Sequence, residues 1–299
     1  MKIRAIKTYY KQLSVFYKHS QAIKRVKFSK DGTNIAASVG SNTIEIFDAK
    51  LQSIQVLKGH SDWVNDIDFS SDNNTILSCS KDETIRLWNV NSGKEVRTLE
   101  GHTDVVVSAR FSPNGNTILS GSMDGTIRVW DLESGKTIKV MGEHVACVLH
   151  AQFSPDGRFI VSSLIDATIE IWDAQSGKKV NKLKGHLKQV LQSQFSPDCR
   201  FLVSCSSDKT IRIWDLKSSK EMKKIEGHSN WINSVKYLPD GQSVVSASRD
   251  QTIRIWNVNT GKEIQKLEGH KNHVRDIDVS FDGKTIVSCC NDGMIRLWG

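Results

Sequence analysis

Apolar side chains recur in short runs along the chain, at a two-residue period that is broken at the same place in each run. Val64, Ile67 and Phe69 show the first run of one such unit, and a step of three inside a period of two predicts a strand with a β-bulge. A second strand (TILSCS, 75–80), a third strand (TIRLW, 84–88) and a fourth strand that ends in Gly-His follow. No segment has a helical period, so the pattern predicts an all-β protein.

The same unit returns every 41 or 42 residues and tiles the chain seven times, without an insertion long enough to form another domain. The repeats start near regularly spaced histidines: His19, His60, His102, His144, His186, His228 and His270. Twenty-eight residues after each histidine comes an aromatic residue, Phe47 in the first repeat and Trp in the others. All four prolines share one slot, in a turn between the first and second strands, as turn chemistry favours.

Three short signatures carry a family resemblance. Gly59-His60 shows the Gly-His pair, Asp82 the aspartate 22 residues after the histidine, and Trp130-Asp131 the Trp-Asp pair that ends the third strand. These signatures recur in six to seven repeats over roughly residues 11–299, and the chain resembles the WD-repeat (β-transducin-like) family. The resemblance implies a seven-bladed β-propeller in which every blade is a four-stranded antiparallel sheet.

The ends of the sequence predict how the ring closes. Gly299 follows the third strand of the last repeat, so the seventh blade needs an outer strand from elsewhere. Residues 11–18 (KQLSVFYK) precede His19 as outer strands precede the other histidines, with Leu13 and Phe16 in the apolar slots. We therefore expect a basic N-terminal tail at 1–10 and a single propeller at 11–299, closed by an N-terminal strand that completes the last blade.

Every regular repeat contains His, Ser, Asp and Trp in fixed register, which superficially suggests a hydrolase. An active site is not expected in six copies and no GxSxG motif is present, so we expect no enzyme and no catalytic residue. In the family resembled, these side chains form a hydrogen-bonded structural network. Its expected members are His60, Ser78, Asp82, Trp88; His102, Ser120, Asp124, Trp130; His186, Ser204, Asp208, Trp214; His228, Ser246, Asp250 and Trp256.

The first repeat and the cysteines depart from this chemistry. The first repeat keeps His19 but has Ala37, Ser41 and Phe47 in the other slots, which predicts a blade held by packing and by the closing strand. Cysteines recur in a slot that elsewhere holds small residues, and no CxxC pair or phosphate-binding loop occurs. We expect no metal and no cofactor.

The charge distribution changes the meaning of the basic composition. The net charge is +8, and eight of the 41 Lys and Arg residues lie within residues 1–27, where no Asp or Glu occurs. The other 33 balance the 33 acidic residues. Sequence-independent phosphate attraction through this end is one hypothesis. The alternative is that Lys24, Arg25 and Lys27 belong to the first blade and leave only Lys2, Arg4 and Lys7 on a free tail.

Partners of propellers that resemble this one commonly dock on the narrow top face, at slots three and five residues after the histidine and one before the Asp. These slots predict an apolar arc on blades three to five: Val105, Val107, Met123, Cys147, Leu149, Ile165 and Leu191. They predict Trp63, Asn65, Lys81, Trp231, Asn233, Arg249, His273 and Arg275 on the flanking blades. An apolar patch with Trp and Arg is typical of interaction sites, although some of these side chains could instead pack between blades.

The sequence thus favours a non-enzymatic scaffold that binds an apolar and acidic peptide or protein. We expect a monomeric propeller within a larger complex, intracellular, cytoplasmic or nuclear, without membrane contact. One alternative is a component of a ribonucleoprotein assembly that contacts nucleic acid through the basic end. A weaker alternative is the substrate receptor of a cullin-type ubiquitin ligase, for which Trp214–Lys217 (WDLK) is the nearest approach to a WDxR sequence.

Overall fold

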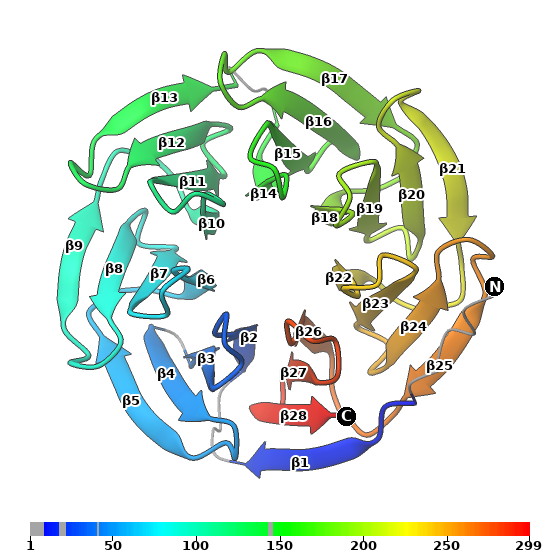
Figure 1. The fold of residues 1–299 in the computed structure, drawn as a ribbon, viewed down its shortest axis with the longest axis horizontal. Helices are drawn as coiled ribbons and strands as arrows, with labels where there is room; N and C mark the ends of the chain where they lie inside the picture. Colours follow the sequence, from blue (N-terminus) through cyan, green and yellow to red (C-terminus); the bar gives the residue numbers. More distant parts are fainter. Residues whose placement is uncertain (1–8, 18–21, 41, 143–145) are drawn as a thin grey trace.

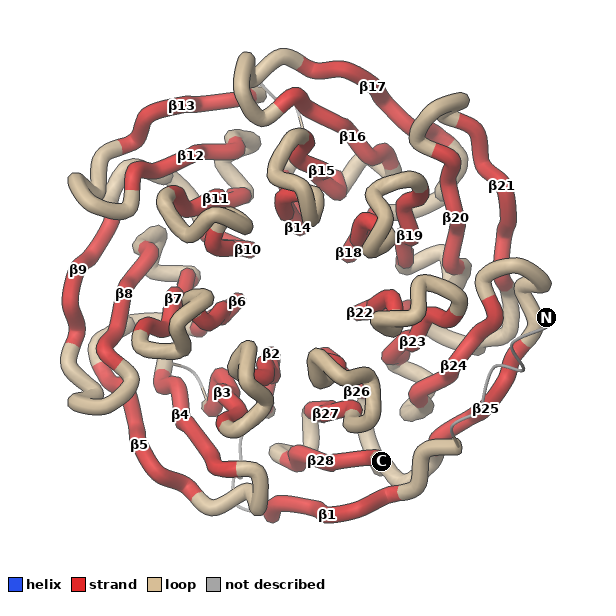
Figure 2. The backbone as a smooth tube through the Cα atoms, in the orientation of Figure 1, coloured by secondary structure: helices blue, strands red, loops and turns tan. Residues whose placement is uncertain are grey.

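Seven four-stranded antiparallel sheets are arranged as blades around a central axis (Figure 1). The computed structural model describes residues 9–17, 22–40, 42–142 and 146–299. These ranges contain no helix, and therefore none long and apolar enough to cross a membrane. Where the connecting residues are described, loops join the outer strand of a blade to the innermost strand of the next (Figure 2). The prediction of an all-β, seven-bladed propeller is confirmed.

Strand position within a blade follows chain order. The innermost strands are β2 (Ile23–Phe28), β6 (Val64–Phe69), β10 (Val106–Phe111), β14 (Val148–Phe153), β18 (Val190–Phe195), β22 (Ile232–Tyr237) and β26 (Val274–Val279). The second strands are β3 (Asn34–Val39), β7 (Thr75–Ser80), β11 (Thr117–Ser122), β15 (Phe159–Leu164), β19 (Phe201–Ser206), β23 (Ser243–Ser248) and β27 (Ile286–Cys290).

The third strands are β4 (Thr43–Asp48), β8 (Ile85–Asn89), β12 (Ile127–Asp131), β16 (Thr168–Asp173), β20 (Ile211–Asp215), β24 (Ile253–Asn257) and β28 (Met294–Trp298). The outer strands are β5 (Ser53–Lys58), β9 (Glu95–Leu99), β13 (Thr137–Met141), β17 (Lys179–Lys184), β21 (Lys220–Ile225), β25 (Glu263–Leu267) and β1 (Gln12–Tyr17). Blade one is β2 to β5, blade two is β6 to β9, and blade seven is β26, β27, β28 and β1.

The interrupted hydrophobic period marks a real irregularity. The register between the first and second strands of blade two shifts between Val64 and Asp66, and every other blade shifts at the same place. The bulge points Val64 and Ile67 into the core on either side of the irregularity, where both are buried. The step of three in the sequence therefore predicted the β-bulge correctly.

The ring closes through the pairing of the first strand with the last. Strand β1 runs antiparallel to β28, with Gln12 opposite Trp298 and Tyr17 opposite Met294 (Figure 1). Beyond the strand, the Lys11 and Gly299 backbones exchange two hydrogen bonds of 2.8 and 2.9 Å. Tyr10, which we expected in the tail, is only 3% exposed and packs with the core between blades six and seven.

One side chain of the closing strand differs from the prediction. Phe16 packs on the core between blades one and seven, as expected. Leu13 does not, because it lies at a register shift in β1 and is 62% exposed. Val96 has the corresponding place in β9, also at a register shift, and is equally exposed, so the outer-strand bulge turns an apolar residue outward in both blades.

Hydrophobic clusters lie between neighbouring blades. Ile44 and Leu57 of blade one pack with Phe69 and Trp88 of blade two, for example, and similar clusters follow around the ring. Polar side chains on the innermost strands add links from blade to blade. Asp66 accepts a hydrogen bond from the Ala109 backbone, and equivalent bonds run from Val26 to Asp276 and from Val235 to Gln192. Each blade is therefore held by its neighbours and not by its own sheet alone.

Candidate partner-binding face

The predicted top-face slots meet at one edge of each blade. The backbone N–H of the residue before the Asp donates to the carbonyl of the residue three after the His, for example from Lys81 to Trp63 at 2.9 Å. The same bond joins Met123 to Val105, Ile165 to Cys147, Ser207 to Gln189, Arg249 to Trp231 and Asn291 to His273. The three sequence slots thus form a recurring surface unit, which we call the rim.

Blades three to five carry the apolar part of the rim, which we call the apolar arc. Only Met123 and Ile165 are clearly exposed, at 39% and 46%. The other members are half-buried: Val105, Val107, Cys147, Leu149 and Leu191. Leu191 also packs against the core between blades five and six. The arc is therefore a shallow apolar surface with two projecting side chains, narrower than seven fully exposed residues would give.

Blades six, seven, one and two carry the cationic part of the rim, which we call the cationic arc. Lys24 Nζ of blade one lies 4.2 Å from the centre of the Trp63 ring of blade two. Arg249 stacks on Trp231 within blade six, with its guanidinium carbon 3.9 Å from the ring centre. Both tryptophans are half-buried, so each ring serves as a platform for a cation and not as a bare apolar contact.

Amides fix the orientation of these cations. Asn65 accepts a hydrogen bond from Lys24 and donates to the Val106 carbonyl of blade three. Asn233 repeats this arrangement in blade six, where it accepts from Arg249 Nε and donates to the Val274 carbonyl of blade seven. An amide bonded on both sides loses little entropy on binding, so the cations are held ready for a partner.

The cationic arc has a surplus of positive charge. No ion pair joins Lys24, Arg249 or Arg275 to a carboxylate of the described residues, whereas the exposed Lys81 pairs with Asp62 at 3.1 Å. Burial and the neighbouring Arg25 and Arg275 lower the pKa of Lys24 to about 8. Burial and Arg275 lower the pKa of Arg249 in the same way. Mutual repulsion of this kind favours the approach of an anionic group.

The predicted network is formed in blades two, three, five and six. In blade two, His60 Nδ1 lies 2.8 Å from Asp82 and Nε2 lies 2.8 Å from Ser78, whose hydroxyl accepts the Trp88 indole N–H at 2.7 Å. The same contacts, at 2.7 to 2.9 Å, join His102, His186 and His228 to their partners.

This connectivity is that of a catalytic triad, yet the geometry supports a structural role. Ser78 is fully buried and its oxygen already accepts the Trp88 N–H, so no substrate carbonyl can approach it. Burial lowers the pKa of His102, His186 and His228 and keeps them neutral. Burial raises the pKa of Asp124, but hydrogen bonds from Thr126 and His102 outweigh it and lower the value to about 2.

The remaining blades differ. In blade one, Ala37 and Phe47 are buried, and the Phe16 ring of β1 lies edge-on to Phe47 with centroids 4.8 Å apart. His19, Ser41 and His144 lie outside the described residues, as do Lys2, Arg4 and Lys7. In blade seven the His270 Nε2 and Trp298 bonds to Ser288 are present, but no bond joins His270 to Asp292.

Part of the basic N-terminal cluster is neutralised near the axis. Arg25 lies 3.5 Å from Asp66, and Lys27 lies 3.5 Å from Asp278 and 3.9 Å from Asp68. These carboxylates belong to blades two and seven, on both sides of blade one. The contacts favour the interpretation that places these cations in blade one, and they reduce the charge available for phosphate binding at this end.

Sequence reasoning missed the contacts between blades. The alignment of slots located Trp63, Trp231 and the cations, but it did not show that Lys24 reaches across to the next blade. The signal was present in the sequence, because blades two and six both have Trp three residues and Asn five residues after the repeat histidine. Reading neighbouring repeats as pairs would have identified it.

Comparisons with known proteins follow the repeat pattern. The family model described as "WD domain, G-beta repeat" matches residues 10–48, 51–89, 93–131, 135–173, 177–215, 219–257 and 261–299. Similar proteins include "WD repeat-containing protein 89 homolog" of Dictyostelium discoideum, 41% identical over 20% of this chain and 18% of that protein. "Nuclear distribution protein PAC1" of Candida tropicalis is 36% identical over 25% of this chain and 16% of that protein.

A third similar protein is "Probable E3 ubiquitin ligase complex SCF subunit sconB" of Arthroderma otae. It is 42% identical over 14% of this chain and 6% of its own length. The matched segments thus span less than a fifth of each of these three relatives.

Proposed function

The chain belongs to the WD-repeat family, whose propellers act as interaction scaffolds in complexes, and from this premise we propose that it is a non-enzymatic scaffold with its binding site on the rim. The partner is a peptide or protein segment that places apolar side chains on blades three to five and acidic groups on blades six to two. The family assignment supports the scaffold role, and the division of the rim supports the chemistry of the partner.

One observation carries this proposal: the rim has two chemically different halves. Met123 and Ile165 project from the apolar arc, while Lys24, Arg249 and Arg275 bond asparagine side chains and form no ion pair with a carboxylate of the described residues. A segment with separated apolar and acidic groups complements both halves at once. Steering by the cationic arc would increase the association rate, and contact with the apolar arc would slow dissociation.

The two alternatives have weaker support. For nucleic acid, the pairing of Arg25 and Lys27 with carboxylates leaves Lys24 as the described cation of this cluster that remains on the rim. For a ubiquitin ligase, the named SCF subunit matches only 43 residues, and Lys217 stands where the WDxR sequence has arginine. We therefore retain the protein scaffold as the proposed function.

The test uses the purified chain and fluorescent peptides of equal length. One peptide alternates leucine with glutamate, a second has lysine in place of glutamate, and a third has serine in place of leucine. We expect the first to bind at least about tenfold more tightly than the others, because it alone satisfies both arcs. Equal binding of all three peptides would contradict the proposal.

Two variants locate the site. Replacing Arg249 and Arg275 with Glu should abolish binding of the acidic peptide, and replacing Met123 and Ile165 with Ser should weaken it about tenfold or more. The matched control replaces Val96 and Val180 with Ser, since these side chains are also apolar and are more exposed, but lie on the outer strands β9 and β17. Loss of binding in this control would place the site on the outer surface.

A further inference from the structure

Blade seven lacks two hydroxyl groups that support the network in four other blades. In blade two, the Ser80 hydroxyl accepts the Asp82 backbone N–H at 3.0 Å, and the Thr84 hydroxyl donates to the Asp82 carboxylate at 2.6 Å. Blades three, five and six have the same pair: Ser122 with Thr126, Ser206 with Thr210, and Ser248 with Thr252. In blade seven these positions hold Cys290 and Met294.

The loss leaves two buried polar atoms without a partner. Within the described ranges, His270 Nδ1 and Asp292 Oδ2 make no hydrogen bond, whereas the corresponding atoms of blades two, three, five and six lie 2.7 to 2.9 Å apart. His270 is only 6% exposed, so water has little access to it. An unpaired polar atom in such a place is costly and calls for a ligand.

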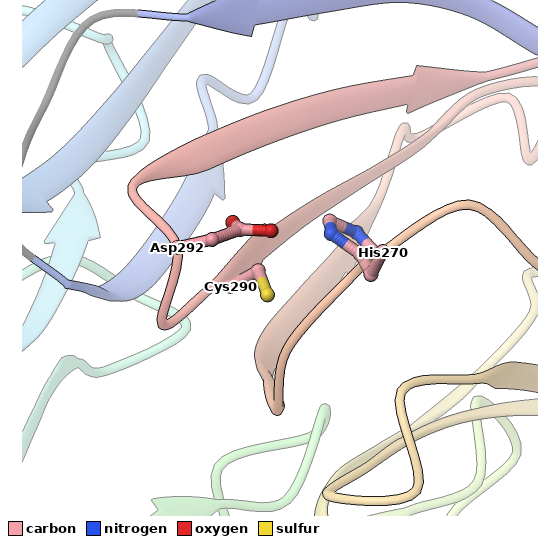
Figure 3. Close-up of side chains that lie close together, drawn as sticks. All are labelled: His270, Cys290 and Asp292. Carbon is pink, nitrogen blue, oxygen red and sulfur yellow. The ribbon is translucent and has the colours of Figure 1, made fainter.

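The second half of the network keeps the His270 ring in place. Nε2 lies 2.7 Å from Ser288, which accepts the Trp298 indole N–H at 2.9 Å. Nδ1 is therefore available on the other side of the ring, toward Cys290 and Asp292 (Figure 3). A fixed second nitrogen is the usual support of a metal-binding histidine, because it sets both tautomer and orientation.

The three side chains form a mixed nitrogen, sulfur and oxygen donor set. The ligand atoms of His270, Cys290 and Asp292 all lie within 4.8 Å of one another. A tetrahedral zinc ion with bonds of ~2.0–2.3 Å holds its ligand atoms ~3.3–3.8 Å apart, so side-chain shifts of ~1 Å would bring them to bonding distance. Thiolate and imidazole select zinc over calcium and magnesium, which prefer oxygen ligands alone.

We propose that His270, Cys290 and Asp292 bind one zinc ion, with a water molecule as the fourth ligand on the partly exposed side of Asp292. The ion takes the place of the missing hydrogen bonds and ties the segment before β26 to the turn between β27 and β28. Blade seven is also the blade that β1 completes, so zinc would stabilise the blade at which the ring closes.

The test uses the untagged, metal-free full chain. Titration with Co²⁺ reports thiolate ligation through its charge-transfer absorption, and competition with Zn²⁺ and a chromogenic chelator gives stoichiometry and affinity. We expect one equivalent to bind with a cobalt–thiolate band, and zinc to raise the melting temperature. Absence of the band, or binding without a thiolate signature, would overturn the proposal in favour of a plain buried cysteine.

The decisive variant is Cys290→Ser with Met294→Thr, which gives blade seven the residues of four other blades and should therefore fold. We expect at least about a 100-fold loss of zinc affinity, since loss of an outer-shell partner alone costs 10–100-fold. Circular dichroism confirms the fold of the double variant. Cys199→Ser, which removes a half-buried thiol in the turn between β18 and β19, is the control and should bind zinc normally. Unchanged binding in the double variant, or lost binding in the control, would place the metal elsewhere.

Discussion

Blade two and blade one fill equivalent buried positions with different side chains, polar in blade two and apolar in blade one. In blade two, Ser78 accepts the Trp88 N–H and bonds His60, which in turn bonds Asp82, so four polar side chains are satisfied inside the blade. In blade one the corresponding positions hold Ala37 and Phe47, and an aromatic ring from β1 supplies the contact. The difference shows that the polar network is one way to stabilise a blade, and that an aromatic contact from the outer strand of the neighbouring blade is another.

The strongest test of this comparison removes β1. Deletion of residues 1–17 exposes the edge of β28 and uncovers the core face of blade one, so we expect mostly insoluble protein and a loss above ~4 kcal/mol in the soluble fraction. Soluble yield and urea unfolding measure the effect. Deletion of residues 1–8 is the matched control and should leave the unfolding midpoint unchanged. Equal midpoints for both deletions would refute the role of the strand.

A smaller effect is expected from the network itself. Ser78→Ala leaves the His60 Nε2 and Trp88 N–H without a partner in a fully buried place, which should cost about 3 kcal/mol in unfolding free energy. The reverse change in blade one, Ala37→Ser, adds a buried hydroxyl beside Phe47 and should cost only ~1 kcal/mol. Urea unfolding of both variants gives the ranking. A larger cost for Ala37→Ser would mean that blade one is the more tightly packed blade.

The aromatic contact of blade one can be tested along a single strand. Phe16→Ala removes the ring that lies edge-on to Phe47, and we expect a loss of about 2 kcal/mol because Phe16 is half-buried. Leu13→Ala on the same strand should change the unfolding free energy by less than ~0.5 kcal/mol, since Leu13 is exposed. Similar costs for the two variants would show that the strand acts through its backbone pairing alone.

The smallest effect distinguishes the blades by pH. The pKa values of His102, His186 and His228 are lowered in the folded protein, so the unfolded chain binds more protons as the pH falls below the usual histidine value of ~6.5. Stability from these groups is present above that pH and is lost below it, by at most ~1.4 kcal/mol per pH unit for each group.

Amide hydrogen exchange, corrected for its intrinsic pH dependence, resolves this effect by blade. Between pH 7 and pH 5, protection should fall in blades three, five and six and change least in residues 22–58 of blade one, where no histidine occurs. A uniform fall around the ring would mean that all blades open together.

The fold could be predicted from the sequence because the same strand pattern occurs in every repeat. The bulge before Ile67, the His60 to Trp88 spacing and the outer-strand pattern of residues 11–18 each reappear or have counterparts in the structure. The repeat pattern could not predict the positions of side chains that depend on contacts with adjacent strands and blades. Lys24 stacks on a tryptophan 39 residues away, and Leu13 turns outward at a register shift, because blade contacts and not slot identity decide these positions.

The candidate sites follow the same division. The sequence slots identified the rim. They did not show which side chains project from it, because that depends on packing between blades, as for Leu191, which packs against the core between blades five and six. In blade seven, the substitutions Cys290 and Met294 were visible in the sequence. Their consequence for His270 and Asp292 became apparent only when five blades could be compared atom by atom.

The pairing of β1 with β28 also governs how the protein matures on the ribosome. Arg296 bonds Gln12 across 284 residues of sequence, so β1 must wait until β28 has been synthesised. At about 5–20 residues per second, synthesis of the residues between them takes ~15–60 s. During that time Phe16 and the edge of β1 have no partner strand, and β1 is open to capture by any other unpaired edge, including β28 of a neighbouring nascent chain. Polysome spacing and chaperone access to residues 9–17 should thus determine whether closed rings or strand-exchanged oligomers form.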